Sequence, residues 1–140
     1  MNEQENTAIV QQAYQKFKTG DIEGVLNLCA EDITWQLPEI DNVPISGERT
    51  GRAAVREFFS MVARDQDVLS FEAREFVAQG DKVVSLGDYQ WRVKDTDREF
   101  ASDFAHVFTV RNGKIVAFRE HFDSAAVARA YQRTGSTAAS

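Results

Sequence analysis

Residues 104–122 read FAHVFTVRNGKIVAFREHF, and this stretch decides the fold. Apolar and polar side chains alternate on both sides of Arg111-Asn112-Gly113, which is the pattern of two strands joined by a tight turn. Asn and Gly tolerate the left-handed backbone that such turns require. The stretch therefore predicts an antiparallel hairpin with one strand over Phe100–Val110 and the other over Lys114–Phe122.

The turn sets the register of this hairpin, and a slip of one residue would exchange its two faces. A two-residue Asn112-Gly113 turn puts His106 opposite Arg119. A three-residue loop, with Gly113 left-handed as a bulge, puts His106 opposite Phe118. We favour the three-residue loop because it gathers the large aromatic side chains on one face. That face then carries Phe104, His106, Phe108, Val116, Phe118, Glu120 and Phe122, and the other carries Ala105, Val107, Thr109, Ile115, Ala117, Arg119 and His121.

Two further strands are predicted upstream, over Leu69–Ala78 and Lys82–Lys94, and the breaks between strands have turn chemistry. Such short links imply an antiparallel meander. The same alternation places Gly87, Tyr89 and Trp91 on the aromatic face.

The N-terminal half has a helical period instead. One helix is predicted over Thr7–Thr19, a second after an Asp21 cap, and a third from Arg52 to about Arg64. A short strand at Ile33–Leu37 and a loop over Pro38–Gly51 separate the second helix from the third.

Helices followed by a meander predict an α+β fold, a cone-shaped curved antiparallel sheet wrapped around the N-terminal helices. Ser124 is expected to cap a short last helix through Tyr131. We expect one domain over residues 1–133 and a disordered tail over 134–140.

Composition limits the partners. The net charge is −6 and the 16 Lys and Arg residues are scattered, so no nucleic-acid partner is expected. No apolar run is long enough to cross a bilayer, so no membrane partner is expected either. Cys29 is the only cysteine, which fits a reducing compartment. The acidic, polar N-terminus is unlike a signal peptide, and the expected location is the cytoplasm.

Two ionisable side chains, His106 and Glu120, are expected to point into an apolar cavity. In the favoured register Glu120 is opposite Phe104 and diagonal to His106. Both side chains suit proton transfer and are the predicted catalytic pair. The alternative is structural: His106 as a satisfied core residue, and Glu120 paired with Tyr89 or a buried water.

The predicted ligand-binding wall is mostly aromatic. It comprises Tyr14, Trp35, Leu37, Phe59, Tyr89, Trp91, Phe104, Phe108, Phe118 and Phe122. The expected ligand is a hydrophobic small molecule. No cofactor is expected. No metal site is expected either, because His106 and His121 face opposite sides of the strands.

Three stretches of the sequence, GDIEGVLNLCAEDITWQLP, ISGERTGRAAVREFF and HVFTVRNGKIVAFREHFD, resemble the nuclear transport factor two-like superfamily, and within it the SnoaL-like and ketosteroid-isomerase-like proteins. The resemblance implies a cystatin-like roll and supports the bulged register. The chain departs from the steroid isomerases where they carry their basic Asp, which is Leu37 here. Their oxyanion-holding Asp falls on His106, and their helix-one Tyr falls on Ala13.

Three functions follow as hypotheses. The first is a cofactor-free lyase, isomerase or cyclase that uses His106 and Glu120 as acid and base. The second is a non-catalytic binding protein, and the third is an interaction module of the same fold. The apolar outer face, with Val107, Thr109, Ile115 and Ala117, together with the resemblance, predicts a homodimer through that face.

Overall fold

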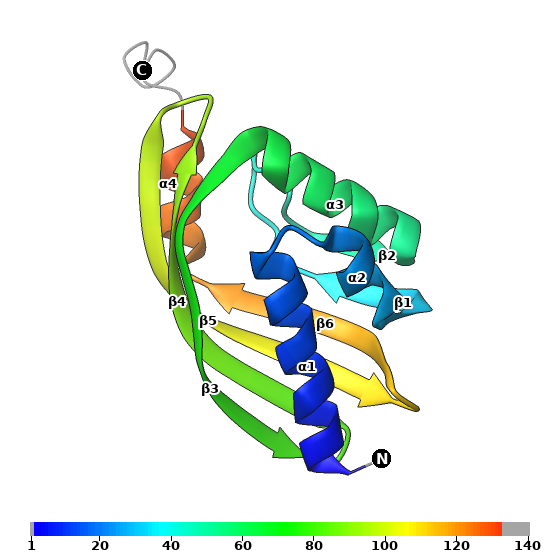
Figure 1. Cartoon of the computed structure of the whole chain (residues 1–140). Coiled ribbons are helices and arrows are strands. Elements are labelled where there is room, and N and C mark those ends of the chain that lie inside the picture. The colour runs from blue at the N-terminus through cyan, green and yellow to red at the C-terminus, as the bar shows by residue number, and fades with distance from the viewer. Residues whose placement is uncertain (1, 133–140) are drawn as a thin grey trace.

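The computed structural model describes residues 2–132. The elements are α1 (Glu3–Lys18), α2 (Ile22–Asn27), β1 (Cys29–Gln36), β2 (Glu48–Thr50), α3 (Arg52–Asp65), β3 (Gln66–Gln79), β4 (Lys82–Val93), β5 (Arg98–Arg111), β6 (Lys114–Phe122) and α4 (Ser124–Tyr131). Figure 1 shows a strongly curved sheet with α1 and α3 lying on its concave side. The α+β cone is therefore confirmed. The tail predicted over 134–140 lies outside the described residues.

The helix starts follow from capping side chains. Helix α1 begins at Glu3, four residues before the predicted Thr7, because Asn2 and Glu5 form a reciprocal capping box with bonds of 2.8 and 3.0 Å. Asp21 caps α2 as predicted. Helix α4 is capped by Asp123 rather than Ser124, since the Asp123 carboxylate accepts the Ala126 N–H.

The sheet has six strands in the order β2-β1-β6-β5-β4-β3. The predicted meander is present as β3 to β6, but the sheet is mixed rather than wholly antiparallel, because β1 pairs parallel with β6. Strand β1 is longer than predicted, and β2 lies inside the segment predicted as a loop. Within residues 2–132, no helix is both long enough and apolar enough to span a bilayer.

The β5–β6 hairpin has a two-residue Asn112-Gly113 turn, so the favoured three-residue loop was wrong. Asn112 and Gly113 have φ values of 51° and 78°, as a type I′ turn requires. A bulge follows in β6: Thr109 pairs with Ala117 and Val110 with Ile115, which leaves Val116 without a partner. Beyond the bulge His106 is directly opposite Glu120, instead of Phe118 or Arg119.

Because of the bulge, the residues of β6 beyond Val116 still face the sides of the sheet that the sequence predicted. Phe118 and Glu120 are buried on the inner face, 6% and 9% exposed. The prediction for Ile115 was wrong: it is buried opposite Val110 instead of lying on the outer face. Thr109 is also buried, under the Lys82 ammonium that donates to its hydroxyl. The outer face is therefore less apolar than predicted.

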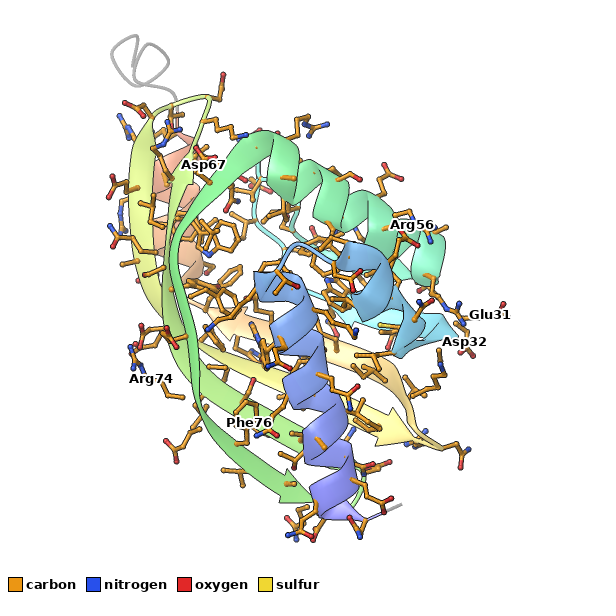
Figure 2. The ribbon with its side chains drawn as sticks, viewed as in Figure 1. Glu31, Asp32, Arg56, Asp67, Arg74 and Phe76 are labelled. Carbon is orange, nitrogen blue, oxygen red and sulfur yellow. The ribbon has the colours of Figure 1, made fainter. Side chains whose placement is uncertain are left out.

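A second bulge, in β3 between Ala73 and Glu75, bends this edge strand over the sheet. In Figure 2 Arg74 points away from the domain, where its guanidinium pairs with Asp88, whereas Phe76 points toward α1. The bend brings the Glu72 carbonyl over Gly87, and a Cβ at Gly87 would lie only 1.9 Å from that oxygen. The curvature that encloses the interior therefore needs glycine at position 87.

Candidate functional site

A cavity of about 110 Å³ lies between the concave face of the sheet and the helices. Helix α1 contributes Tyr14, α3 contributes Phe59, and α4 contributes Val127 at one end. Most of the remaining wall comes from inward residues of the strands. The predicted residues that line it are Tyr14, Trp35, Phe59, Tyr89, Trp91, His106, Phe108, Phe118, Glu120 and Phe122.

Two residues of the predicted wall do not line the cavity. Leu37 follows the end of β1 and is buried in the core, 2% exposed. Phe104 lies beneath the His106 ring, with centroids 4.1 Å apart and an angle of 17° between the planes. Phe104 therefore supports the imidazole from one side.

His106 and Glu120 form a buried pair. The Glu120 Oε2 atom lies 2.7 Å from His106 Nε2, and the Tyr89 hydroxyl donates to the same oxygen at 3.0 Å. Direct cross-strand pairing of β5 and β6 brings the two side chains together, closer than the diagonal arrangement that the sequence suggested. Their side chains are 5% and 11% exposed.

The other ring nitrogen of His106 is also engaged. Its Nδ1 lies 2.6 Å from the Tyr14 hydroxyl, which in turn contacts the Ser85 hydroxyl. A continuous chain of polar groups thus runs from Ser85 through Tyr14 and His106 to Glu120. Tyr14 was expected to serve only as wall, and it is also a hydrogen-bonding partner of the imidazole.

Both tyrosines that contact this group of hydrogen-bonded side chains, Tyr14 and Tyr89, are neutral phenols. Burial, the largest cause, raises the pKa of Tyr14 and the pKa of Tyr89 far above their ordinary value. The nearby Glu120 charge raises both further, and the Ser85 hydrogen bond lowers the Tyr14 pKa in part. Tyr89 therefore remains a donor to Glu120 throughout the neutral range.

Every hydrogen bond from Ser85 through Tyr14 and His106 to Glu120 can be made in either charge state of the imidazole. With a proton on Nε2 only, His106 donates to Glu120 and accepts from Tyr14, while Ser85 donates to Tyr14. When His106 is doubly protonated, Nδ1 donates to Tyr14, which then donates to Ser85. His106 can therefore gain or lose a proton without leaving a buried group unpaired.

Glu120 presents its remaining oxygen to the cavity. Oε1 has no hydrogen-bond partner among residues 2–132, yet it is not one of the fully buried unsatisfied atoms, so it retains accessible surface. Glu120 lines the cavity, and we infer that this surface faces it. Both nitrogens of His106 are occupied, so Glu120 is the group positioned to touch a ligand.

Sequence reasoning missed several residues of the cavity wall and of the polar chain, among them Ser85, Phe71 and Gln66. Ser85 has the same strand parity as Tyr89 and Trp91, so the alternation of β4 could have found it. Phe71 lines the cavity and packs 5.3 Å from Phe104, but the β3 bulges hide its facing. Gln66 is a buried wall residue whose amide donates to Tyr131 at 2.5 Å.

The geometry gives little support for a metal centre in residues 2–132. There, no group of three or more His, Cys, Asp or Glu residues is placed to hold a metal ion. His121 lies exposed on the opposite side of β6 from Glu120.

We expect the folded protein to resist ionisation of its tyrosines. Burial raises the pKa of all three tyrosines, Tyr14, Tyr89 and Tyr131, and raises the pKa of Cys29 to about 11. Tyrosinate absorbance should therefore be weak in the folded protein at pH 11 and appear when urea unfolds it. Tyrosinate titrating near pH 10 while the protein remains folded would contradict the burial.

The same shifts predict loss of stability at high pH. Above pH 9 to 10 the unfolded chain releases these protons and the folded chain retains them, so the unfolded state binds fewer protons and stability falls as pH rises. Each group should lower the free energy of unfolding by about 1.4 kcal/mol per pH unit in that range. Urea titrations between pH 8 and 11 measure the slope, and Tyr89→Phe should make it shallower.

The family model of the SnoaL-like domain matches residues 10–118. An NTF2-like protein from Burkholderia xenovorans LB400 is 36% identical, covers 94% of this chain and 99% of its own, and superposes with a TM-score of 0.86. An NTF2-like protein of unknown function from Burkholderia pseudomallei K96243 is 28% identical, with coverage of 94% and 99% and a TM-score of 0.80.

TerC, crystallised with polyporic acid, is 28% identical, with coverage of 91% and 98% and a TM-score of 0.76. No curated protein is matched. The resemblance expected from the sequence is thus confirmed by a family model spanning most of the chain and by solved structures that match nearly their whole length. The chain belongs to the SnoaL-like domain family, within the NTF2-like superfamily.

Proposed function

We propose that this protein is a cofactor-free enzyme that moves a proton at a carbon atom of a small hydrophobic molecule. The observation that carries the proposal is the state of Glu120. One carboxylate oxygen is held by His106 and Tyr89, and the other faces an aromatic cavity without a partner among the described residues. The free oxygen is therefore the atom of Glu120 that can accept a proton from a bound molecule.

The reaction begins when Glu120 Oε1 accepts a proton from a substrate C–H bond. The electron pair of that bond stays on the substrate as a carbanion or enolate. Glu120 then returns the proton to another atom of the same molecule, which gives net isomerisation. If the carbanion instead attacks a carbonyl carbon within the same molecule, the product is a ring, the carbonyl π pair moves to oxygen, and Glu120 gives its proton to the new alkoxide.

His106 is a positioning residue in this mechanism. Its Nε2 fixes the orientation of Glu120, and Phe104 and Tyr14 fix the imidazole in turn. This assignment changes the sequence-based hypothesis, in which His106 itself exchanged a proton with the substrate.

Two further observations support a small-molecule site. The cavity wall is largely aromatic, and Trp35, Phe58, Phe59 and Phe118 pack with centroids 4.0 to 5.5 Å apart. TerC, a relative of the same fold, was crystallised with polyporic acid. Such an aromatic wall orients an apolar ligand and limits the access of water to the carbanion.

Hydrogen exchange in D₂O tests the proposal. Small ketones and aromatic compounds that raise the melting temperature would be incubated with the protein, and loss of their C–H signals followed by proton NMR. We expect exchange at least about a hundredfold faster than in buffer for one or more of these ligands. Ligands that bind and never exchange above the buffer rate would instead identify a non-catalytic binding protein.

A further inference from the structure

Gln66 places a buried amide group in the cavity wall, where α3 passes into β3. Figure 2 labels the next residue, Asp67, at this place. Gln66 is 5% exposed, and its Nε2 donates to the Tyr131 hydroxyl at 2.5 Å. Its Oε1 has no hydrogen-bond donor among residues 2–132, yet it is not one of the fully buried unsatisfied atoms, so it retains accessible surface. Buried polar groups are almost always satisfied, so this oxygen points to a donor that the folded chain does not supply.

The position of this amide is fixed from three directions. The Gln66 backbone N–H donates to the Val62 carbonyl at the end of α3, and Gln66 forms the first pair of the β3–β4 ladder with Val93. The Tyr131 hydroxyl, on the last residue of α4, holds the side chain. An amide held in this way loses little conformational freedom when a ligand binds to its oxygen.

Two hollows lie near this end of the domain, and Gln66 borders one of them. It lines the cavity, and it does not line the neighbouring surface depression that Arg64, Asp65 and Tyr131 help to form. A ligand in the cavity is therefore the nearest source of a donor for Oε1.

Glu120 is well separated from Gln66 along the same wall. Gln66 is opposite Val93, and Tyr89, whose hydroxyl bonds Glu120, is four residues before Val93 on the same face of β4. Strand rise and strand spacing put the Cα atoms of Gln66 and Tyr89 about 14 Å apart. Trp91 lines the wall between them. The wall therefore has two separate polar positions with an aromatic surface between them.

We propose that Gln66 Oε1 faces the cavity and accepts a hydrogen bond from a hydroxyl group of the ligand, which makes the ligand a phenol or alcohol with an otherwise apolar skeleton. A hydroxyl suits an amide because it can donate to the oxygen and accept from the second N–H. The role in reaction rests on the proposed function: a hydroxyl held at Gln66 directs the other end of the molecule, with the reacting C–H bond, toward Glu120.

Matched pairs of probes test the binding contact without any turnover. 4-Ethylphenol and 4-ethyltoluene differ by exchange of a hydroxyl for a methyl group, as do 2-naphthol and 2-methylnaphthalene. Gln66→Met keeps the length of the side chain and removes the amide. We expect it to weaken the binding of each phenol about tenfold relative to its hydrocarbon partner, the effect of one lost hydrogen bond. Calorimetry on the wild type and the variant gives the four dissociation constants for each pair.

Tyr131→Phe is the matched control. It removes the bond between the amide and α4 and leaves Gln66 Oε1 in place. The ratio of phenol affinity to hydrocarbon affinity should therefore stay close to that of the wild type. If Gln66 served only to anchor α4, the two variants would change this ratio alike.

The wild-type protein provides a second readout that does not depend on the stability of a variant. The side-chain carbonyl carbon of Gln66, assigned by its loss in Gln66→Met, should move downfield in the carbon NMR spectrum when a phenol binds. The hydrocarbon partner should not move it in this way. Gln90 is the internal control, because its amide donates to Glu99 and it does not line the cavity.

Four results would overturn the inference: an affinity ratio that Gln66→Met leaves unchanged, equal ratios in the Gln66→Met and Tyr131→Phe variants, a phenol preference lost in Glu120→Gln rather than in Gln66→Met, or no binding of any probe. Failure of the proposed function is a separate outcome. A hydroxyl contact that depends on Gln66, without any hydrogen exchange in D₂O, would leave the binding assignment intact and remove the catalytic one.

Discussion

Replacing Glu120 with glutamine should lower the turnover number at least about a hundredfold while ligand affinity changes only a few-fold, because a general base acts mainly on the barrier. Glutamine has the same size, and its amide oxygen can still accept the bonds from His106 and Tyr89. It cannot take a proton from carbon. Steady-state kinetics on a substrate found by hydrogen exchange, with affinity measured separately, checks both halves of the expectation.

Glu57→Gln is the matched control for this substitution. Glu57 is exposed on α3, so the same chemical change there should leave turnover unaffected. His106→Asn tests whether His106 acts through Glu120. In that case turnover should fall less than in Glu120→Gln, and the pH profile of turnover should shift. Unchanged turnover in Glu120→Gln would remove the proposed base, and the fold assignment would survive.

Gly87→Ala should destabilise the protein by about 3 kcal/mol or more, the upper part of the range for overpacked interiors. The added Cβ would lie 1.9 Å from the Glu72 carbonyl oxygen and 2.7 Å from Phe104 Cζ. The first of these is backbone and cannot move without opening the bend in β3. No left-handed φ is involved at this position, so the steric clash alone decides the sign.

The Gly87→Ala substitution should also disturb the candidate site, because Phe104 stacks on the His106 ring and is directly opposite Gly87 in the sheet. Thermal and urea unfolding measure the stability loss, and the Tyr14–His106 contact can be followed in the NMR spectrum. Gly20→Ala is the control: φ is +80° there and nothing lies within 4 Å, so only the backbone cost of about 1–2 kcal/mol applies. A Gly87→Ala variant as stable as wild type would contradict the close approach of β3.

Helices, strands and their facing were largely predictable from the sequence. A period of two residues assigns each side chain of β4 and β5 to one face, and this places Tyr89, Trp91 and His106 inward without any knowledge of the partner strands. Asp21 as a helix cap is equally local, because the carboxylate bonds an N–H three residues away. These features depend only on neighbours in the chain, which the sequence displays directly.

The site itself was predictable only in part. The alternation of inward and outward side chains identified His106 and Glu120 as candidates. The bulge at Val116 decided that the two residues are directly opposite, with Nε2 and Oε2 2.7 Å apart. A bulge adds one residue to one strand at small cost, so the pattern of apolar residues cannot locate it.

Tertiary structure alone decided the contacts between distant segments. Tyr14 meets a histidine 92 positions away, and Trp35 of β1 pairs in parallel with Phe118 of β6, 83 positions downstream. The contact of Gln66 with Tyr131 and the close approach of Glu72 to Gly87 have the same origin. The sequence determines which side chains are inward, through local periodicity. Which inward side chains meet depends on strand order, bulges and sheet curvature, and these are set by the packing of the whole chain.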